Sequence, residues 1–208
     1  MSTITPNKTD SVEVLAHQAV THPTTVVGSA IDVSTARRVR LFLFHAYVEA
    51  TADTNYGSFL VQLRPDAGNS SVNEHWITVA KLDALGTTPD TEAMTATEPA
   101  GETVLAVAST TGFVAGDLLY IQDTGTLADS EWARCKTFTT NTDIKLIDGL
   151  TTQKDSSDVI WNDASEWVID LDVTTSEAYR VVWTHEGATG ANGHVKVLGV
   201  TYTGDTSS

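Results

Sequence analysis

The sequence predicts an all-β protein: a jelly-roll-like β-sandwich that carries a small β-barrel-like module inserted in one of its loops. Short runs of alternating apolar and polar residues recur along the chain, separated by Gly, Pro, Asn and Asp, as in strands joined by turns. Thr, Ser and Val are plentiful, and β-branched side chains favour a pleated sheet over a helix. Between residues 101 and 163 the apolar runs are shorter and closer together, which indicates a separate unit.

The N-terminal part predicts a polar arm followed by five strands. Residues 1–10 contain Pro6 and no apolar cluster, so they are expected to form a flexible N-terminal arm. The strongest strand signal is 38–49, where large apolar side chains fall on both faces, so this strand is expected in the centre of a sheet with both faces covered. The other strands are expected at 12–19, 26–33, 59–64 and 74–82.

The central stretch predicts a compact β unit of its own. Gly112 and Gly116 lie in a turn between two apolar runs, where glycine can adopt positive φ at no steric cost. Asp148 and Gly149 mark a second turn. The strands of this unit are expected at 104–108, 118–121, 131–138, 143–147 and 159–161.

The last forty residues predict long strands again, at 166–172, 178–185 and 194–202. Three strands are too few to close a core alone, so they are expected to complete the sheets that began before the module. The predicted organisation is a discontinuous sandwich of residues 1–95 plus 165–208, with the module at 97–163. Insertions of this kind succeed at exposed loops whose ends lie close together.

The charge balance argues against nucleic-acid binding. Twelve basic and 27 acidic residues give a net charge of −15, which repels a phosphate backbone. The one dense basic run, Arg37, Arg38 and Arg40, alternates with apolar residues in a strand, so ion-paired or solvated side chains are expected there. No apolar run is long enough to span a membrane, and no secretory signal is recognisable, so a protein made in the cytoplasm is expected.

The histidines show no metal-binding motif in the sequence. None has the i, i+4 or close-pair spacing that metal sites use. A three-histidine zinc site from His45, His75 and His185 is chemically feasible if their strands are neighbours, but positions at strand ends or interfaces are the expected ones. The six histidines are His17, His22, His45, His75, His185 and His194.

No pattern of catalytic residues is recognisable. Cys135 lies between two cations, which would activate a thiol, but strand alternation turns it away from them, so a buried thiol is expected. The acidic residues lack the spacing of a calcium loop, and no carboxylate pair stands out for glycoside hydrolysis. We therefore expect no enzyme activity, metal or cofactor, and we expect the acidic residues in solvated turns. These residues are Asp53; Asp123, Asp129 and Glu131; and Asp155, Asp158 and Asp163.

Five tryptophans raise the alternative of a sugar-binding platform. Four of them fall in predicted strands beside apolar residues, which favours the core or a subunit interface. Trp161 precedes the end of the module and is expected to pack the module against the sandwich. The candidate interface or core aromatics are Trp76, Trp161 and Trp183.

The module resembles one that recurs in structural proteins of tailed bacteriophages. Residues 102–123 read ETVLAVASTTGFVAGDLLYIQD, residues 131–135 read EWARC, and residues 144–150 read IKLIDGL. The resemblance covers about sixty residues and implies a virion component.

Among virion proteins, the resemblance, together with the size, acidity and predicted β structure, favours a capsid decoration (cement) protein. Such a protein would be a homotrimer that binds the major capsid protein on the outer surface of the phage head and stabilises contacts between capsomers. It would bind neither nucleic acid nor a membrane. The alternative is a tail, neck or fibre-associated virion protein with receptor or glycan binding; a β-fold hydrolase is more remote.

Overall fold

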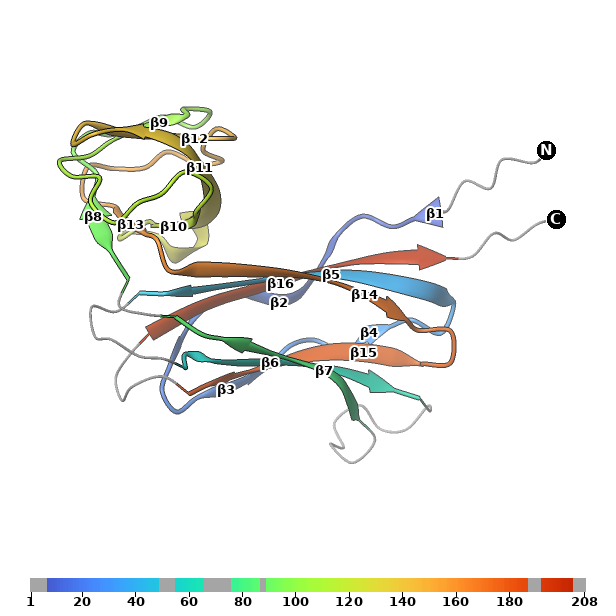
Figure 1. Ribbon diagram of the computed structural model, residues 1–208. Helices are drawn as coiled ribbons and strands as arrows, with labels where there is room; N and C mark the ends of the chain where they lie inside the picture. The colour runs from blue at the N-terminus through green and yellow to red at the C-terminus, as the bar shows by residue number, and fades with distance from the viewer. Residues whose placement is uncertain (1–6, 49–54, 66–75, 87–88, 187–191, 204–208) are drawn as a thin grey trace.

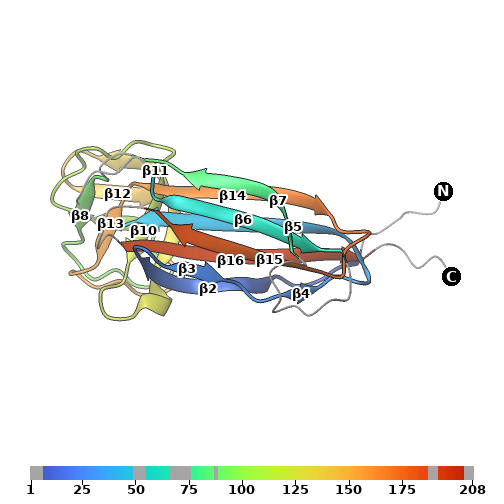
Figure 2. The same cartoon turned by 90° about the horizontal axis from the view of Figure 1, so that it is seen from below.

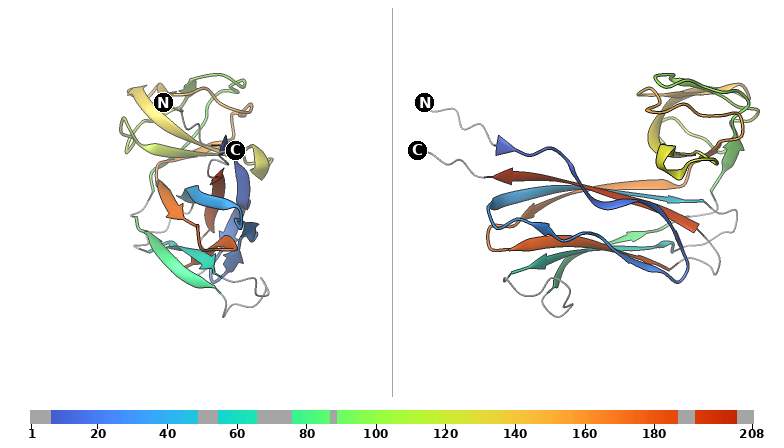
Figure 3. Two further views of the ribbon diagram at one scale, coloured as in Figure 1. Left: turned by 90° about the vertical axis from the view of Figure 1, so that its right-hand side faces the viewer. Right: turned by 180° about the vertical axis from the view of Figure 1, so that it is seen from behind.

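The computed structural model describes residues 7–48, 55–65, 76–86, 89–186 and 192–203, which form three antiparallel β-sheets (Figure 1). The all-β prediction is confirmed: besides strands, the described residues contain a single 3-10 turn, η2, at Leu127–Asp129. Two of the sheets pack face to face as a sandwich, and the third forms the module. The module stands on the sandwich at the end opposite to the chain termini (Figure 3).

Sheet A has the order β2–β16–β5–β14, with the short β1 also paired to β16. Because β5 lies between β16 and β14, it is the central strand that its apolar residues predicted. The strands of sheet A are β1 (Asn7–Lys8), β2 (Val12–Thr21), β5 (Ala36–Tyr47), β14 (Ala164–Asp172) and β16 (Asn192–Thr203).

Sheet B has the order β3–β15–β6–β7, with the short β4 also paired to β15. The predicted strand at 26–33 is split here into β3 and β4. Gly28 lies at the split, and a Cβ there would come within 2.6 Å of the carbonyl oxygen of Val14. The strands of sheet B are β3 (Thr25–Val27), β4 (Ile31–Asp32), β6 (Gly57–Arg64), β7 (Ile77–Ala84) and β15 (Ala178–His185).

The order of these strands is that of a jelly roll. Apart from the short β1 and β4, which lie in the same sheet as their neighbours β2 and β3, successive sandwich strands alternate between sheets A and B, except for the β6–β7 pair, which stays in sheet B. The last strand, β16, inserts between β2 and β5, and β15 inserts between β3 and β6, which produces the two interlocked Greek keys of this fold. The sandwich core lies between the sheets, where Leu41, Leu43, Phe59, Val181 and Trp183 are fully buried.

The module is a six-stranded sheet that curls into a barrel. Its order is β8–β13–β10–β11–β12–β9, and a bridge between Met94 and Val107 brings its first strand against its last. The backbone N–H of Thr95 donates to the carbonyl of Ala106 at 2.9 Å beside this bridge. The strands are β8 (Thr91–Ala93), β9 (Val104–Ala106), β10 (Leu118–Gln122), β11 (Glu131–Thr139), β12 (Asp143–Leu146) and β13 (Val159–Trp161).

The module joins the sandwich between β7 and β14. Its first strand begins at Thr91, earlier than the predicted start at residue 97, because β8 pairs with β13. The two connections are held together at Asp90, whose N–H donates to the side chain of Asn162 at 2.8 Å and whose carbonyl accepts the N–H of Asn162 at 3.2 Å. The entry and the exit of the chain therefore lie side by side.

Part of the predicted arm is paired within the chain. Asn7 and Lys8 pair with Thr203 and Tyr202 of β16, so the arm prediction does not hold for these two residues, and residues 1–6 lie outside the described ranges. The edge strands β7 and β14 run along one side of the sandwich, and β2, β3 and β4 lie on the other side (Figure 2).

Candidate functional site

The module is held to the outer face of sheet A by a buried junction at the start of β14 (Figure 1). Ala46 and Tyr120 are fully buried there, and Val48 is 8% exposed. Trp132, Trp161 and Ala164 pack against these three residues, so strands of both units contribute to one cluster. Burial of aromatic area of this kind supplies the main attraction between packed units.

The hydroxyl of Tyr120 links two histidines of the sandwich at the centre of the junction. It lies 3.0 Å from Nε2 of His17 and 2.7 Å from Nδ1 of His194. A tyrosine hydroxyl donates one hydrogen bond, so one histidine nitrogen accepts it while the other histidine donates its N–H to the tyrosine oxygen. The imidazole that accepts this hydrogen bond must therefore be neutral.

Burial keeps these imidazoles neutral. Burial, with a smaller effect of the Lys196 ammonium, lowers the pKa of His17 to about 4, and burial, with the neighbouring His17, lowers the pKa of His194 to about 4. Burial likewise raises the pKa of the Tyr120 phenol above its ordinary value.

Trp132 of β11 forms the second part of the junction. Its indole N–H donates to the backbone carbonyl of His45 at 3.2 Å, and its ring lies 4.9 Å from the ring of His17 and 5.6 Å from that of Phe44. The sandwich and the module are therefore joined by directional hydrogen bonds as well as by apolar contacts.

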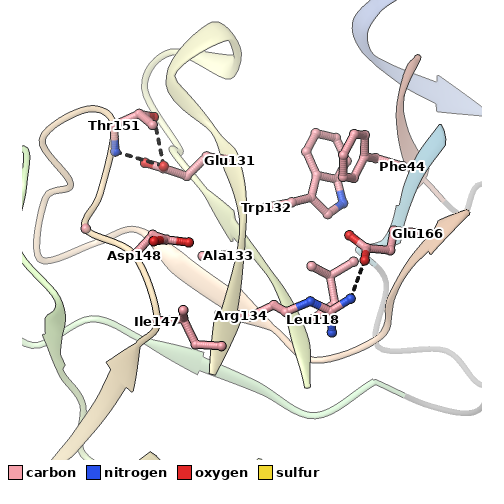
Figure 4. A pocket seen from close by; sticks show the side chains of 11 residues that line it. Phe44, Leu118, Glu131, Trp132, Ala133, Arg134, Ile147, Asp148, Thr151 and Glu166 are labelled. Carbon is pink, nitrogen blue, oxygen red and sulfur yellow. Dashed lines mark hydrogen bonds and ion pairs between the residues drawn. The ribbon is translucent and has the colours of Figure 1, made fainter. Parts of the chain in front are cut away.

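A hollow of about 290 Å³ opens at the corner between the module and the outer face of sheet A (Figure 4). We call it the corner pocket. Phe44 and Trp132 lie on one side of it, and Ile147, which is 53% exposed, lies on the other. Arg134 of the module pairs with Glu166 of β14 at its edge, so an ion pair also connects the two units.

Glu131, which also lines the corner pocket, is engaged by the module itself. Its Oε2 accepts the N–H and the hydroxyl of Thr151, and its Oε1 lies 2.8 Å from Nζ of Lys154. Lys154 is fully buried and also donates to the carbonyl of Asp129 at 2.6 Å. This cation fastens two loops of the module together.

A second hollow, of about 350 Å³, lies among the module loops that carry the predicted acidic residues. Asp123 accepts the N–H groups of Gly125 (2.9 Å) and Thr126 (2.6 Å), and Asp158 accepts that of Asp155 at 2.8 Å. These carboxylates stabilise turns. Across the described ranges, no group of three or more His, Cys, Asp or Glu is arranged to hold a metal ion.

The three predicted aromatics lie in three different environments. Trp183 is fully buried in the sandwich core. Trp76 is 7% exposed, and the guanidinium of Arg180 lies 4.3 Å from its ring centre, so this ring offers no open platform to a sugar. Trp161 packs in the junction, as predicted, and its N–H donates to Gln122 at 3.0 Å.

Of the histidines considered for zinc, His45 and His185 come close together and His75 lies outside the described residues. A Cβ placed on Gly193 would lie 3.3 Å from Nε2 of His45 and 3.1 Å from Nδ1 of His185. Burial, with smaller effects of His185 and His194, lowers the pKa of His45 to about 3. The pair belongs to the sandwich interior, where His45 stacks on Trp183 at 4.8 Å.

The remaining predicted candidates have structural positions. Cys135 is fully buried, as alternation predicted, and burial raises the pKa of its thiol. Arg38 and Arg40 both pair with Asp170 of β14, at 2.6 Å and 2.9 Å. These guanidiniums hold the pKa of the Asp170 carboxyl well below its ordinary value. Arg37 is exposed, and Asp53 lies outside the described ranges.

The sequence did not single out His17, His194, Tyr120, Trp132 or Lys154 as a set. The first four come together only because the module folds back onto sheet A: Tyr120 is 103 residues from His17 and 74 residues from His194 in the sequence. The one feature of the sequence that indicated a contact between the module and the sandwich was Trp161, which lies near the end of the module.

The sequence matches no family model and no curated protein. Among solved structures, the chain is similar to the SPBc2 prophage-derived protein YomS, with a TM-score of 0.31 and 9% identity over 98% of this chain and 99% of that chain. It is also similar to the VP2 subviral particle of infectious bursal disease virus (TM-score 0.24, 7% identity, 95% of this chain and 41% of that chain). A third similarity is to VP17, a capsid protein of bacteriophage P23-77 (TM-score 0.20, 8% identity, 95% and 97%). No helix in the described part of the chain is long and apolar enough to cross a membrane.

Proposed function

We propose that this chain is a structural protein of a tailed-phage virion, and specifically a capsid decoration protein that binds the outer surface of the head. The observation that carries the proposal is the insertion itself. A module whose sequence resembles those of phage structural proteins is fastened to a jelly roll, an architecture that viral capsid proteins use.

The polar groups of the two hollows support a non-catalytic role. Arg134 pairs with Glu166, Glu131 is held by Thr151 and Lys154, and the loop aspartates hold turns. Groups used in this way fix the shape of a surface. In a decoration protein, such a shaped surface would bury apolar area against the major capsid protein and link neighbouring capsomers.

The test is binding to phage heads. Purified protein is mixed with expanded and with unexpanded heads of the phage or prophage that encodes it, and pelleting is measured for each. We expect a trimer that pellets with expanded heads and raises the temperature at which they release DNA. A chain that pellets with neither kind of head, and that whole-particle density places on a tail or fibre, would refute the decoration role.

A further inference from the structure

The module covers only one end of the outer face of sheet A. The registers of β14 and β16 on β5 align the outward side chains in rows across the sheet, and the row under the module is Ala164, Ala46 and His194. We call the four rows beyond it the open face. In order away from the module they are Glu166, Phe44 and Lys196; Val168, Phe42 and Leu198; Asp170, Arg40 and Val200; and Asp172, Arg38 and Tyr202.

The second row of the open face is apolar on β14, β5 and β16, and it ends at Glu13 of β2, opposite Leu198. Val168 is 55% exposed, and Phe42 and Leu198 are half-buried. Phe44, in the row before, continues this apolar surface into the corner pocket. An apolar centre within a rim of charged groups that includes arginine is the usual anatomy of a protein–protein contact. The prediction that both faces of β5 are covered is therefore wrong beyond the module.

The open face ends at an edge strand whose pairing no β-bulge interrupts. β14 is nine residues long, pairs in sheet A only with β5, and its register is unbroken. The other edge strand on this side, β7, has a register shift opposite Val61 and Gln62, which is the kind of irregularity that discourages edge-to-edge pairing. The side at β14 is thus the one suited to a further chain.

The charges of the open face identify the partner. Its four rows contain three carboxylates (Glu166, Asp170, Asp172) and three cations (Lys196, Arg40, Arg38). On the far side of β16 the rows continue with Glu13 opposite Leu198 and Lys8 opposite Tyr202, so the charges still cancel. The net charge of −15 therefore belongs to the rest of the chain. Two copies of so acidic a protein repel each other in most relative orientations. The repulsion is weakest where the two copies meet through surfaces that are apolar and carry no net charge.

We propose that a second copy of this chain packs on the open face, with Val168 at the centre of the contact. This inference deepens the trimer of the proposed function and rests on that function, but it concerns the free protein and can be tested without heads.

The test compares two aspartate substitutions at equally exposed valines. Val168→Asp places a carboxylate in the apolar row of the open face. Val27→Asp places a carboxylate on β3, on the outer face of sheet B, where Val27 is 53% exposed, and is the control. Mass in solution is measured by light scattering over a concentration series, and circular dichroism checks the fold of each variant. Val168→Thr, which keeps the shape of the side chain, is included in case the aspartate disturbs β14.

We expect wild type and Val27→Asp to reach the same multiple of 22.2 kDa, and Val168→Asp to dissociate at least about tenfold more readily. Val168→Thr should show a smaller loss of the same kind. Added salt should strengthen association, because it screens the repulsion between like-charged copies. A wild type that is monomeric throughout, or a Val168→Asp variant that associates as tightly as wild type, would overturn the proposal.

Head binding separates this inference from the proposed function. If wild type is monomeric and only Val168→Asp loses head binding, the open face belongs to the capsid protein, and the second-copy proposal fails while the decoration role stands. If copies associate through Val168 but no head is bound, the decoration role fails and this inference stands.

Discussion

Acid should destabilise this protein through the junction, and replacing His194 by asparagine should remove a defined part of that effect. His194 contacts Tyr120 through Nδ1, and an asparagine side chain places a polar atom near the same position without titrating. The replacement therefore keeps a polar neighbour for the tyrosine hydroxyl and removes the proton-binding site.

The expected magnitude follows from the pKa of His194, which burial lowers from 6.5 to about 4. Above pH 6.5 the imidazole is neutral in both the folded and the unfolded chain, so the full stability is present. As the pH falls from 6.5 towards 4, His194 binds a proton in the unfolded chain but stays neutral in the folded chain, so the folded state loses stability relative to the unfolded state. At pH 5 the loss amounts to about 2 kcal/mol for this group.

His45, whose pKa is about 3, adds a loss of similar size at pH 5, and the half-buried His17 adds less. Wild type should therefore lose about 4 kcal/mol or more between pH 8 and pH 5. In His194→Asn that loss should be smaller by about 2 kcal/mol, even if the substitution costs about 1 kcal/mol at pH 8.

Urea unfolding at pH 8, 6.5 and 5 measures this difference, followed by tryptophan fluorescence and by circular dichroism so that separate unfolding of the two units would be seen. Tyr120→Phe is the matched control, because it removes the hydroxyl but leaves both histidines buried. It should lower stability by the same amount at each pH. If His194→Asn loses as much stability as wild type on acidification, the junction histidine is not the acid-sensitive group, and the reasoning fails.

Two further outcomes are expected. Lys154→Met leaves the Glu131 carboxylate, which is 12% exposed, without its cation and should destabilise the module by about 3 kcal/mol. Adding Glu131→Gln to this variant should restore part of the lost stability. Equal melting temperatures for wild type, the single variant and the double variant would contradict this prediction. Replacing residues 91–161 by a short Gly-Ser linker should leave a folded sandwich, because Asp90 and Asn162 are already hydrogen-bonded to each other. Far-UV circular dichroism and a cooperative thermal unfolding transition would show the folded sandwich. An unfolded product would mean that the two β units form one cooperative structure.

The sequence alone determined the strands and the fold class. Alternation of apolar and polar residues has a period of two in any strand, so the predicted segments agree with β5, β6, β10, β11 and β13 to within a few residues. The boundary of the module was less visible, because β8 is three residues long and is defined only by its pairing with β13.

The tertiary structure decided which side chains meet. Strand alternation says that His17, Tyr120 and His194 each point to one face of a strand, but not that the module folds onto that face of sheet A. The strand registers then decided that Val168, Phe42 and Leu198 form one row and that the charges around them cancel. Contacts between distant segments depend on the order of strands in the sheets, and no local pattern encodes that order. The sequence showed the module as a separate stretch of short strands and as the source of the family resemblance. Only the tertiary structure showed that the module covers one end of sheet A and leaves the open face uncovered.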